Sequence, residues 1–314
     1  MSEGRVARWR QLIRPVASLA RAADFYVGAL GFQPASGAAR LTVEQALVTA
    51  AYGGSAVAAV TLAAGEQMLT LVELASYALP STFDTGAGDP RFQHVAVIVE
   101  DMEAAWKRLR ERAHGLRAIS RDGPQRLPMS AGGVSAIKFR DPDGHPVELL
   151  SYDAARVPRH WRDAAARPRE PGQTVLGIDH TAIGVADAES SIRFYSEVLG
   201  LTLSARQTNQ GAEQERLDGL DGAVVDVVAL SPQHATPHIE LLAYRDVHQG
   251  ASGGPVGVRG FTVLQVDDLP ALIAHWRRRM EGPVQPRVSH HADIMLAHDP
   301  DGHALLLWQP TGAA

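Results

Sequence analysis

The stretch Gly177-Ile178-Asp179-His180-Thr181-Ala182-Ile183-Gly184-Val185 decides the fold, because it contains a pattern that recurs along the chain. Every second residue from Thr181 onward is apolar or β-branched, which is the period of two of a half-buried β-strand. His180 therefore belongs to the opposite face of that strand. Glu240 follows in a second apolar run, His238-Ile239-Glu240-Leu241-Leu242.

Internal repeats divide the chain into four modules of one kind. Their equivalent positions lie 81 to 86 residues apart and are occupied by Gln11, His94, His180 and Phe261. Seven residues after each of them comes a residue suited to cap a helix N-terminus. These residues are Ser18, Asp101, Asp187 and Asp268.

Two further motifs alternate between the modules. The first and third modules share Phe-Tyr followed by Leu-Gly, at Phe25-Tyr26 and Phe194-Tyr195. The second and fourth modules share Asp-Pro-Asp-Gly-His, at Asp141–His145 and Asp299–His303. The Leu-Gly pair is typical of a helix C-terminus, and Asp-Pro-Asp-Gly is typical of a tight turn before a strand.

Each module is predicted to be a strand, a helix and then several strands, so the fold class is α+β with βαβββ units. Helices are expected over 20–29, 102–112, 188–198 and 269–280. Later strands are expected over 69–74, 135–139, 146–152, 223–229, 238–244 and 304–309. The apolar face of each sheet needs a helix to cover it. The face with His and Glu needs another module, so we expect two curved sheets that meet face to face around a cleft.

The domain organisation follows from the modules. Residues 1–152 form an N-terminal domain with modules at about 8–80 and 90–152. Residues 175–314 form a C-terminal domain with modules at about 175–246 and 256–310. Residues 153–174 are rich in Pro, Arg and Ala without apolar periodicity and are predicted to be a linker.

Composition excludes several classes of function. A net charge of −5 gives no basic field, so nucleic acid is not an expected partner. No apolar run reaches the roughly 20 residues that span a bilayer, and no secretory signal is recognised, so we expect a cytoplasmic protein without a membrane partner. The absence of Cys rules out disulfides, thiolate metal ligands and a cysteine nucleophile.

The βαβββ unit with His on its first strand, Phe-Tyr and Leu-Gly on its helix and Glu-Leu on its last strand resembles the vicinal oxygen chelate superfamily. This superfamily includes glyoxalase I, extradiol dioxygenases and bleomycin resistance proteins. The resemblance covers nearly the whole chain as four modules. It implies two curved-sheet clefts and a metal held by one residue from the first strand and one from the last strand of each paired module.

The resemblance assigns two candidate ligand positions to each module. They are Gln11 and Glu73 in the first, His94 and Glu148 in the second, His180 and Glu240 in the third, and Phe261 and Leu306 in the fourth. If sequence neighbours pair, one cleft holds Gln11, Glu73, His94 and Glu148. If the middle modules pair, His94, Glu148, His180 and Glu240 share one cleft. We favour the second arrangement, because the first leaves His180 and Glu240 opposite Phe261 and Leu306, where a buried carboxylate lacks a partner.

Two imidazoles and two carboxylates suit one divalent ion, which could be Ni, Zn, Fe(II), Mn or Co. The resemblance then implies a metal-dependent lyase or isomerase of glyoxalase I type. Its small-molecule substrate would present vicinal oxygens and pass through an enediolate, with Glu148 or Glu240 as general base. One alternative is an Fe(II) extradiol-type dioxygenase that uses His94, His180 and Glu148. Another is a binding or resistance protein with an apolar cleft lined by Phe261, Leu306 and Trp308.

Other polar residues have weaker assignments. His145 and His303 are explained by their turns, and Tyr152 and Tyr244 share the phase of the glutamates four residues earlier. Four modules in one chain can complete both clefts, so either a monomer or a homodimer is compatible with the sequence.

Overall fold

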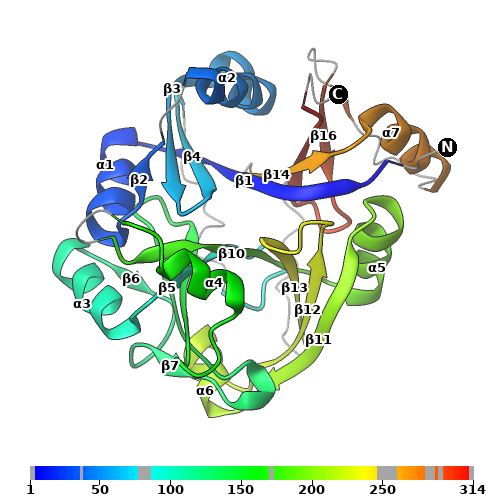
Figure 1. The fold of residues 1–314 in the computed structure, drawn as a ribbon. Coiled ribbons are helices and arrows are strands. Elements are labelled where there is room, and N and C mark those ends of the chain that lie inside the picture. Colours follow the sequence, from blue (N-terminus) through cyan, green and yellow to red (C-terminus); the bar gives the residue numbers. More distant parts are fainter. Residues whose placement is uncertain are drawn as a thin grey trace.

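The structure, a computed structural model, describes residues 4–35, 38–76, 86–169, 173–245, 260–279, 287–288 and 293–310. It confirms the α+β class, with two large mixed sheets and helices at their sides (Figure 1). None of the helices in these ranges is long and apolar enough to cross a membrane.

The two sheets each contain strands from both halves of the chain. The first sheet has the strand order β15-β16-β17-β14-β1-β4-β3-β2. Its strands are β1 (Val6–Val16), β2 (Gln33–Pro34), β3 (Ala56–Ala64), β4 (Gln67–Leu74), β14 (Phe261–Val266), β15 (Arg287–Val288), β16 (Ile294–His298) and β17 (Ala304–Trp308). The second sheet has the order β11-β12-β13-β10-β5-β9-β8-β6, with β7 paired to β8. Its strands are β5 (Gln93–Val99), β6 (Arg117–Ala118), β7 (Gln125–Arg126), β8 (Val134–Arg140), β9 (Pro146–Tyr152), β10 (Val175–Gly184), β11 (Thr202–Gln210), β12 (Val224–Ser231) and β13 (His238–Tyr244).

The pairing of the modules is the second of the two arrangements. The first strands of the middle modules, β5 and β10, pair antiparallel, and the first strands of the outer modules, β1 and β14, do the same. The expectation of two sheets that face each other across each cleft is wrong. Each cleft is the concave side of one continuous sheet, because the modules join edge to edge through these strand pairs.

The helices begin where the repeated polar residues predict. Asp101 accepts a hydrogen bond from the backbone of Ala104 at the start of α3 (Met102–Arg112), and Asp187 accepts one from Glu189 at the start of α5 (Ala188–Arg193). Asp268 caps α7 (Leu269–Arg279) in the same way, and Ser18 caps α1 (Leu19–Ala23). Two of these helices continue into a π-helical turn that carries the Phe-Tyr motif, η1 (Asp24–Leu30) after α1 and η5 (Phe194–Val198) after α5.

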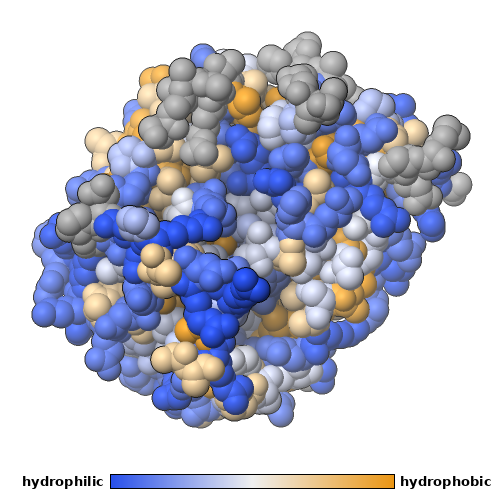
Figure 2. Space-filling view, in the orientation of Figure 1, coloured by the Kyte–Doolittle hydropathy of each residue, from blue (hydrophilic) through white to orange (hydrophobic). Residues whose placement is uncertain are grey.

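Three helices lie outside the predicted pattern. They are α2 (Ala38–Tyr52), α4 (Arg159–Ala165) and α6 (Ala212–Asp218). The segment predicted as a linker therefore contains α4, whose Trp161 is buried against the second sheet. Strongly hydrophilic side chains gather over α4 on the face shown in Figure 2, so this helix has one buried residue and a solvated outer side. Short 3-10 turns complete the described elements at Gly53–Ser55 and Met129–Ala131.

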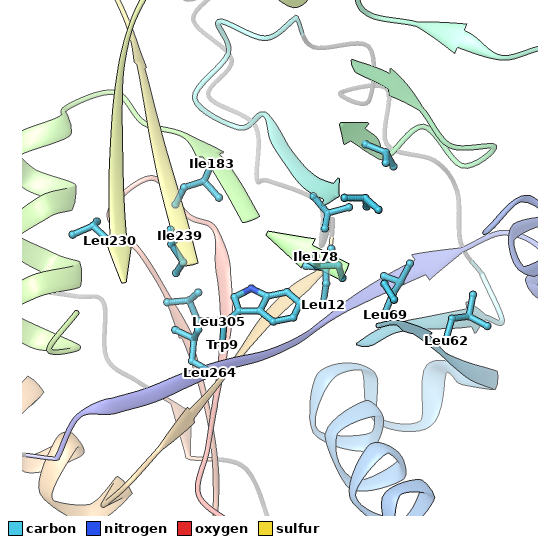
Figure 3. Close-up of a cluster of buried hydrophobic side chains, with 14 of the residues drawn as sticks. Trp9, Leu12, Leu62, Leu69, Ile178, Ile183, Leu230, Ile239, Leu264 and Leu305 are labelled. Atoms are coloured by element: carbon cyan, nitrogen blue, oxygen red, sulfur yellow. The ribbon is translucent and has the colours of Figure 1, made fainter. Parts of the chain in front are cut away.

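A common apolar core joins the two sheets. Trp9 of β1 is buried at its centre, near Leu12, Leu264 and Leu305 of the first sheet (Figure 3). Ile178, Ile183, Leu230 and Ile239 of the second sheet face them (Figure 3). The Trp9 indole also donates a hydrogen bond of 3.0 Å to Oγ1 of Thr181 on β10. The faces that turn away from the clefts are therefore covered by the other sheet as well as by helices.

The two alternating motifs bind each other. The hydroxyl of Tyr26 donates to the carboxylate of Asp141 at 2.8 Å, and the hydroxyl of Tyr195 donates to Asp299 at 3.0 Å. Each bond joins a Phe-Tyr helix to the Asp-Pro-Asp-Gly turn of the next module in sequence. The sheets join modules one to four and two to three, whereas these bonds join one to two and three to four. The four modules are thereby closed into a ring.

Removal of the Tyr26 hydroxyl tests this connection. Tyr26→Phe leaves the buried Asp141 carboxylate and the Arg14 guanidinium, which donates to Tyr26 at 2.9 Å, without that partner. We expect the free energy of unfolding to fall by about 2 kcal/mol, the usual cost of unsatisfied buried polar groups. Urea unfolding measures it. Val57→Ala, at an exposed residue, should change stability by less than about 0.5 kcal/mol. Equal stability of Tyr26→Phe and wild type would contradict the role of this bond.

Candidate metal centre

The four residues predicted to share a cleft lie on four neighbouring strands of the second sheet. The strands are β13, β10, β5 and β9, and they carry Glu240, His180, His94 and Glu148 respectively. All four side chains line one cavity of about 170 Å³. The strand pairing that assembles the sheet thus also assembles this group.

The register of the strands explains why the four side chains converge. Ala182 of β10 pairs with His94 on one side and with Glu240 on the other. Ala96 of β5 occupies the same place between His180 and Glu148. Directly paired residues project to the same face of a sheet. Because both alanines are small and buried, the longer side chains on each side can lean over them and meet.

Three of the four residues form a compact set, which we call the trio: His94, Glu148 and His180. Their ligand atoms all lie within 4.8 Å of one another. Oε2 of Glu148 is 3.0 Å from Nε2 of His94 and 3.8 Å from Nε2 of His180. Two imidazole nitrogens and a carboxylate oxygen at this spacing could hold one divalent ion.

Glu240 stands beside the trio. Its Oε2 is 3.3 Å from Nε2 of His180, and its Oε1 is 3.4 Å from Nε2 of His238 on the same strand. Its side chain is 21% exposed, compared with 7% for Glu148. Glu240 is therefore the more accessible of the two carboxylates.

Asp179 orients His180, although it precedes His180 directly on β10. The register of β10 against β5 shifts between Ile178 and His180, which marks a β-bulge at Asp179. A bulge lets two successive residues project to one side of a sheet. Oδ2 of Asp179 lies 2.9 Å from Nδ1 of His180, and Oδ1 accepts a hydrogen bond of 3.2 Å from the indole of Trp161 on α4. In the neutral ring, a proton kept on Nδ1 leaves Nε2 of His180 directed at the trio as an acceptor.

Opposite charges dominate the His180–Glu240 side of the site. Burial alone would lower the pKa of His180, but the carboxylates of Glu240, Asp179 and Glu148 raise this pKa to about 9. Burial likewise opposes ionisation of Glu240, yet His180 and His238 lower the pKa of Glu240 to about 2. In the absence of a metal, an imidazolium and a carboxylate therefore face each other here.

The His94–Glu148 side has a different balance. Burial lowers the pKa of His94 by more than the carboxylate of Glu148 raises it, so His94 is neutral near pH 7. Glu148 keeps a lowered pKa despite its burial, because the ammonium of Lys138 and the ring of His94 favour the charged form. Lys138 pairs with Glu148 across β8 and β9, and its Nζ donates to Asp218 of α6 at 2.7 Å.

Two buried ring nitrogens of this site lack a hydrogen-bond partner among the described residues. Nδ1 of His94 and Nε2 of His180 are buried and find no hydrogen bond of ordinary geometry in the described part of the chain. Buried nitrogens without partners are rare in native proteins. The Nε2 atom of His180 belongs to the trio, and loss of the proton it holds below a pKa of about 9 would free its lone pair for a cation.

The outer cleft differs at every equivalent position. Gln11 and Phe261 lie where the repeat places them, and Leu306 pairs with the strand as predicted. The equivalence of Glu73 with Glu148 is wrong, because Thr70 pairs with the residue two after Gln11. Glu73 instead accepts a hydrogen bond from the backbone of Leu19. The described residues of this cleft therefore contain no group that resembles the trio.

Helix α2 covers Phe261, Leu306 and Trp308 in the outer cleft, so the prediction that these three side chains line an open apolar pocket is wrong. Leu47 and Val48 of α2 pack in one buried cluster with Phe261, Leu306 and Trp308. The Arg10 guanidinium lies 4.8 Å from the Trp308 ring and pairs with Glu44 of α2. The apolar side chains expected to receive a ligand are instead covered by the chain itself.

Several residues of the inner cleft are missing from the sequence prediction. They are Lys138, Trp161, Asp179, Asn209, Gln214, Asp218 and His238. His238 could have been found, since it is two residues before Glu240 and shares its phase. Tyr244 was expected on this face and does line the cavity. Its hydroxyl lies close to Asp218 without hydrogen-bond geometry, and burial together with that carboxylate raises the pKa of Tyr244.

Comparisons with known proteins agree with this fold. The family model described as Glyoxalase/Bleomycin resistance protein/Dioxygenase superfamily matches residues 9–149 and 177–307. The chain belongs to this superfamily. A search of curated protein sequences finds no match.

Solved structures show the same architecture at low sequence identity. Glyoxalase I from Zea mays is 17% identical with a TM-score of 0.56, and the alignment covers 96% of this chain and 92% of that protein. A mutant of the same maize enzyme has a TM-score of 0.58 at 16% identity, with the same coverage. A proposed dioxygenase from Bacillus subtilis subsp. subtilis str. 168 is 12% identical with a TM-score of 0.56, covering 98% of this chain and 86% of that protein. These similarities establish the fold.

The protonation states of the trio and Glu240 predict how the affinity of the site for a divalent ion depends on pH. A metal must displace the proton that His180 holds below its pKa of about 9. His94 is already neutral, and both glutamates are ionised near pH 7. The affinity for Mn²⁺ should therefore rise about 10-fold per unit between pH 6 and pH 8. Counting free Mn²⁺ by electron paramagnetic resonance measures this slope.

Two histidine variants test whether the trio is the binding site, one at the trio and one at an exposed control position. His94→Ala should lose about 100-fold or more in Mn²⁺ affinity, since it removes a nitrogen of the trio. His114→Ala, at an exposed histidine, should bind Mn²⁺ as wild type does. A pH-independent affinity, or equal binding by His94→Ala and wild type, would show that the trio is not the site.

Proposed function

We propose that this protein is a metal-dependent enzyme of lyase or isomerase type that transfers a proton on a small molecule with two vicinal oxygens. The observation that carries the proposal is the position of Glu240. It lies in the same cavity as the trio and beside it, with its carboxylate ionised and partly exposed. A general base next to a cation site is the arrangement that abstraction of an acidic C–H proton needs.

His94, Glu148 and His180 would hold one divalent ion, with Ni, Zn, Fe(II), Mn and Co as candidates for this donor set. When bound, such an ion would act as a Lewis acid that polarises the vicinal oxygens and stabilises the enediolate left by loss of the proton. Asp179 contributes by holding the ring of His180 through Nδ1, and Trp161 holds Asp179.

Glu240 would accept the proton and return it. Its Oε1 lies near Nε2 of His238, which holds the carboxylate, and its Oε2 lies 3.3 Å from Nε2 of His180. Glu148 is less suited to this role, because His94 and the charge of Lys138 hold it in place. Deep burial of the trio excludes bulk water, which strengthens each of these charge interactions.

All of these residues come from one chain, so a monomer would suffice for the proposed reaction, and a homodimer is also compatible with it. We further propose a cytoplasmic enzyme whose partner is its substrate, without nucleic acid or a membrane.

Glu240→Gln separates the base from the cation site. We expect the rate of proton abstraction to fall about 100-fold to 10,000-fold, with metal content unchanged. The measurement is solvent deuterium incorporation, followed by NMR, into a panel of small α-hydroxy carbonyl compounds: glycolaldehyde, glyceraldehyde and dihydroxyacetone. Glu103→Gln, at an exposed carboxylate, is the matched control and should behave as wild type. Metal-loaded wild type that exchanges no proton in any of these compounds, or full activity of Glu240→Gln, would count against the proposal.

A second candidate is an Fe(II) extradiol-type dioxygenase. The observation that favours it is the trio itself, since two histidines and one carboxylate are the ligand set of many non-haem Fe(II) oxygenases. Oxygen uptake with catechol and Fe(II) tests it. Uptake that is lost in Glu148→Ala and kept in Glu240→Ala would replace the first proposal with this one.

A further inference from the structure

The wall of the cavity beyond the trio is polar. Lys138, Asn209, Gln214 and Tyr244 line it, together with apolar side chains such as Leu217. These polar residues come from β8, β11, α6 and β13. Asn209, Gln214 and Tyr244 are not needed to hold a cation or to supply the base in the proposed reaction.

Two polar atoms of this wall lack a hydrogen-bond partner in the described part of the chain. Oε1 of Gln214 and Oδ1 of Asn209 are buried and make no hydrogen bond within the described residues, whereas the hydroxyl of Tyr244 lies beside the carboxylate of Asp218. Gln214 and Asn209 are more than nine-tenths buried. Native proteins rarely leave such atoms unsatisfied without a ligand or an ordered water. Their position on one cavity wall points to a ligand-binding subsite.

The orientation of Gln214 is fixed, which defines the chemistry of its ligand. Nε2 of Gln214 donates to Oδ2 of Asp218 at 2.6 Å, and Oδ1 of the same carboxylate accepts from Lys138. A flipped amide would place its oxygen against that carboxylate, so the oxygen faces the cavity as an acceptor. It can be satisfied only by a donor. Carbonyl and carboxylate oxygens cannot supply one, whereas a hydroxyl group can.

The subsite lies close to the candidate metal centre. Glu148 of the trio pairs directly with Lys138 across the sheet, Lys138 binds Asp218, and Asp218 binds Gln214. The subsite is therefore connected to Glu148 of the trio through Lys138 and Asp218. The cavity of about 170 Å³ is smaller than the roughly 300 Å³ or more of sites for drug-sized ligands. A molecule that reaches both ends has only a few carbon atoms.

We infer that the substrate is a short hydroxyl-rich carbonyl compound or acid, in which vicinal oxygens at one end approach the trio and hydroxyl groups at the other end bind the subsite. This inference rests on the proposed function, since it assigns the substrate class of the same site. A catechol would place an apolar ring against Gln214 and Asn209 and leave their oxygens unsatisfied.

Two acids with one carbon skeleton provide the test. Threonate and 2-hydroxybutanoate both carry a carboxylate beside a hydroxyl, and only threonate has hydroxyls on the third and fourth carbons. Calorimetry with the Mn²⁺-loaded protein should show threonate, or its diastereomer erythronate, binding at least about 10-fold more tightly, since the extra hydroxyls satisfy buried acceptors.

Substitutions in the subsite show whether its residues cause the preference for threonate. Gln214→Leu and Asn209→Leu should each reduce the ratio of the two affinities to less than about threefold. Gln45→Leu makes the same chemical change at an exposed residue and should leave both affinities as in wild type. Asn209→Leu removes a different oxygen that lacks a hydrogen bond, so it keeps the test decisive even if Gln214→Leu fails to fold.

Equal affinities for the two acids in wild type would overturn the inference, and so would a preference that survives in both variants. Mn²⁺ content is measured in every sample. Protein that binds no Mn²⁺ contradicts the proposed function and the inference with it. Protein that binds Mn²⁺ and both acids equally contradicts the substrate class alone.

Discussion

The antiparallel pairing of β5 with β10 is the constraint on which the site depends. This pairing places His94 opposite Ala182 and His180 opposite Ala96, so each histidine has a small residue beside it and a glutamate one strand further on. A shift of the register by one residue would turn one set of side chains to the opposite face of the sheet. The convergence of four polar side chains is therefore a consequence of strand register.

The same chain contains two clefts built on one plan, and only one has the polar set. In the outer cleft, Phe261 and Leu306 pack with residues of α2, and this apolar cluster contributes to the core. In the inner cleft, α4 and α6 supply Trp161, Gln214 and Asp218, which extend the polar network around the trio. Helix α2 thus makes the outer cleft part of the apolar core, whereas α4 and α6 add polar side chains around the inner cleft. Hydrogen bonds between Tyr26 and Asp141 and between Tyr195 and Asp299 join the modules of the first sheet to those of the second.

Much of this arrangement could be predicted from the sequence, because it depends on periodic features. The βαβββ modules, the helix caps and the inward face of His94, Glu148, His180 and Glu240 all follow from residues at fixed spacing. Whether these four residues bind a metal stays a prediction. Features that break the period could not be predicted. The bulge at Asp179 brings a neighbour of His180 to the same face, which strict alternation forbids. The resemblance implies Glu73 as a ligand position, whereas the register of β1 against β4 places Thr70 there. Lys138 and Asp218 meet only through the tertiary packing of α6 on β8.

Anomalous diffraction from crystals grown with Mn²⁺ tests the central claim most directly. The account predicts one strong peak in the inner cleft within about 2.0–2.4 Å of a ligand atom from each of His94, Glu148 and His180. A peak on the other side of His180, between Asp179 and His238, would contradict it, because those atoms also lie within 4.8 Å of one another and would form a different site. The absence of any peak in this cleft, in crystals that contain Mn²⁺, would contradict it equally.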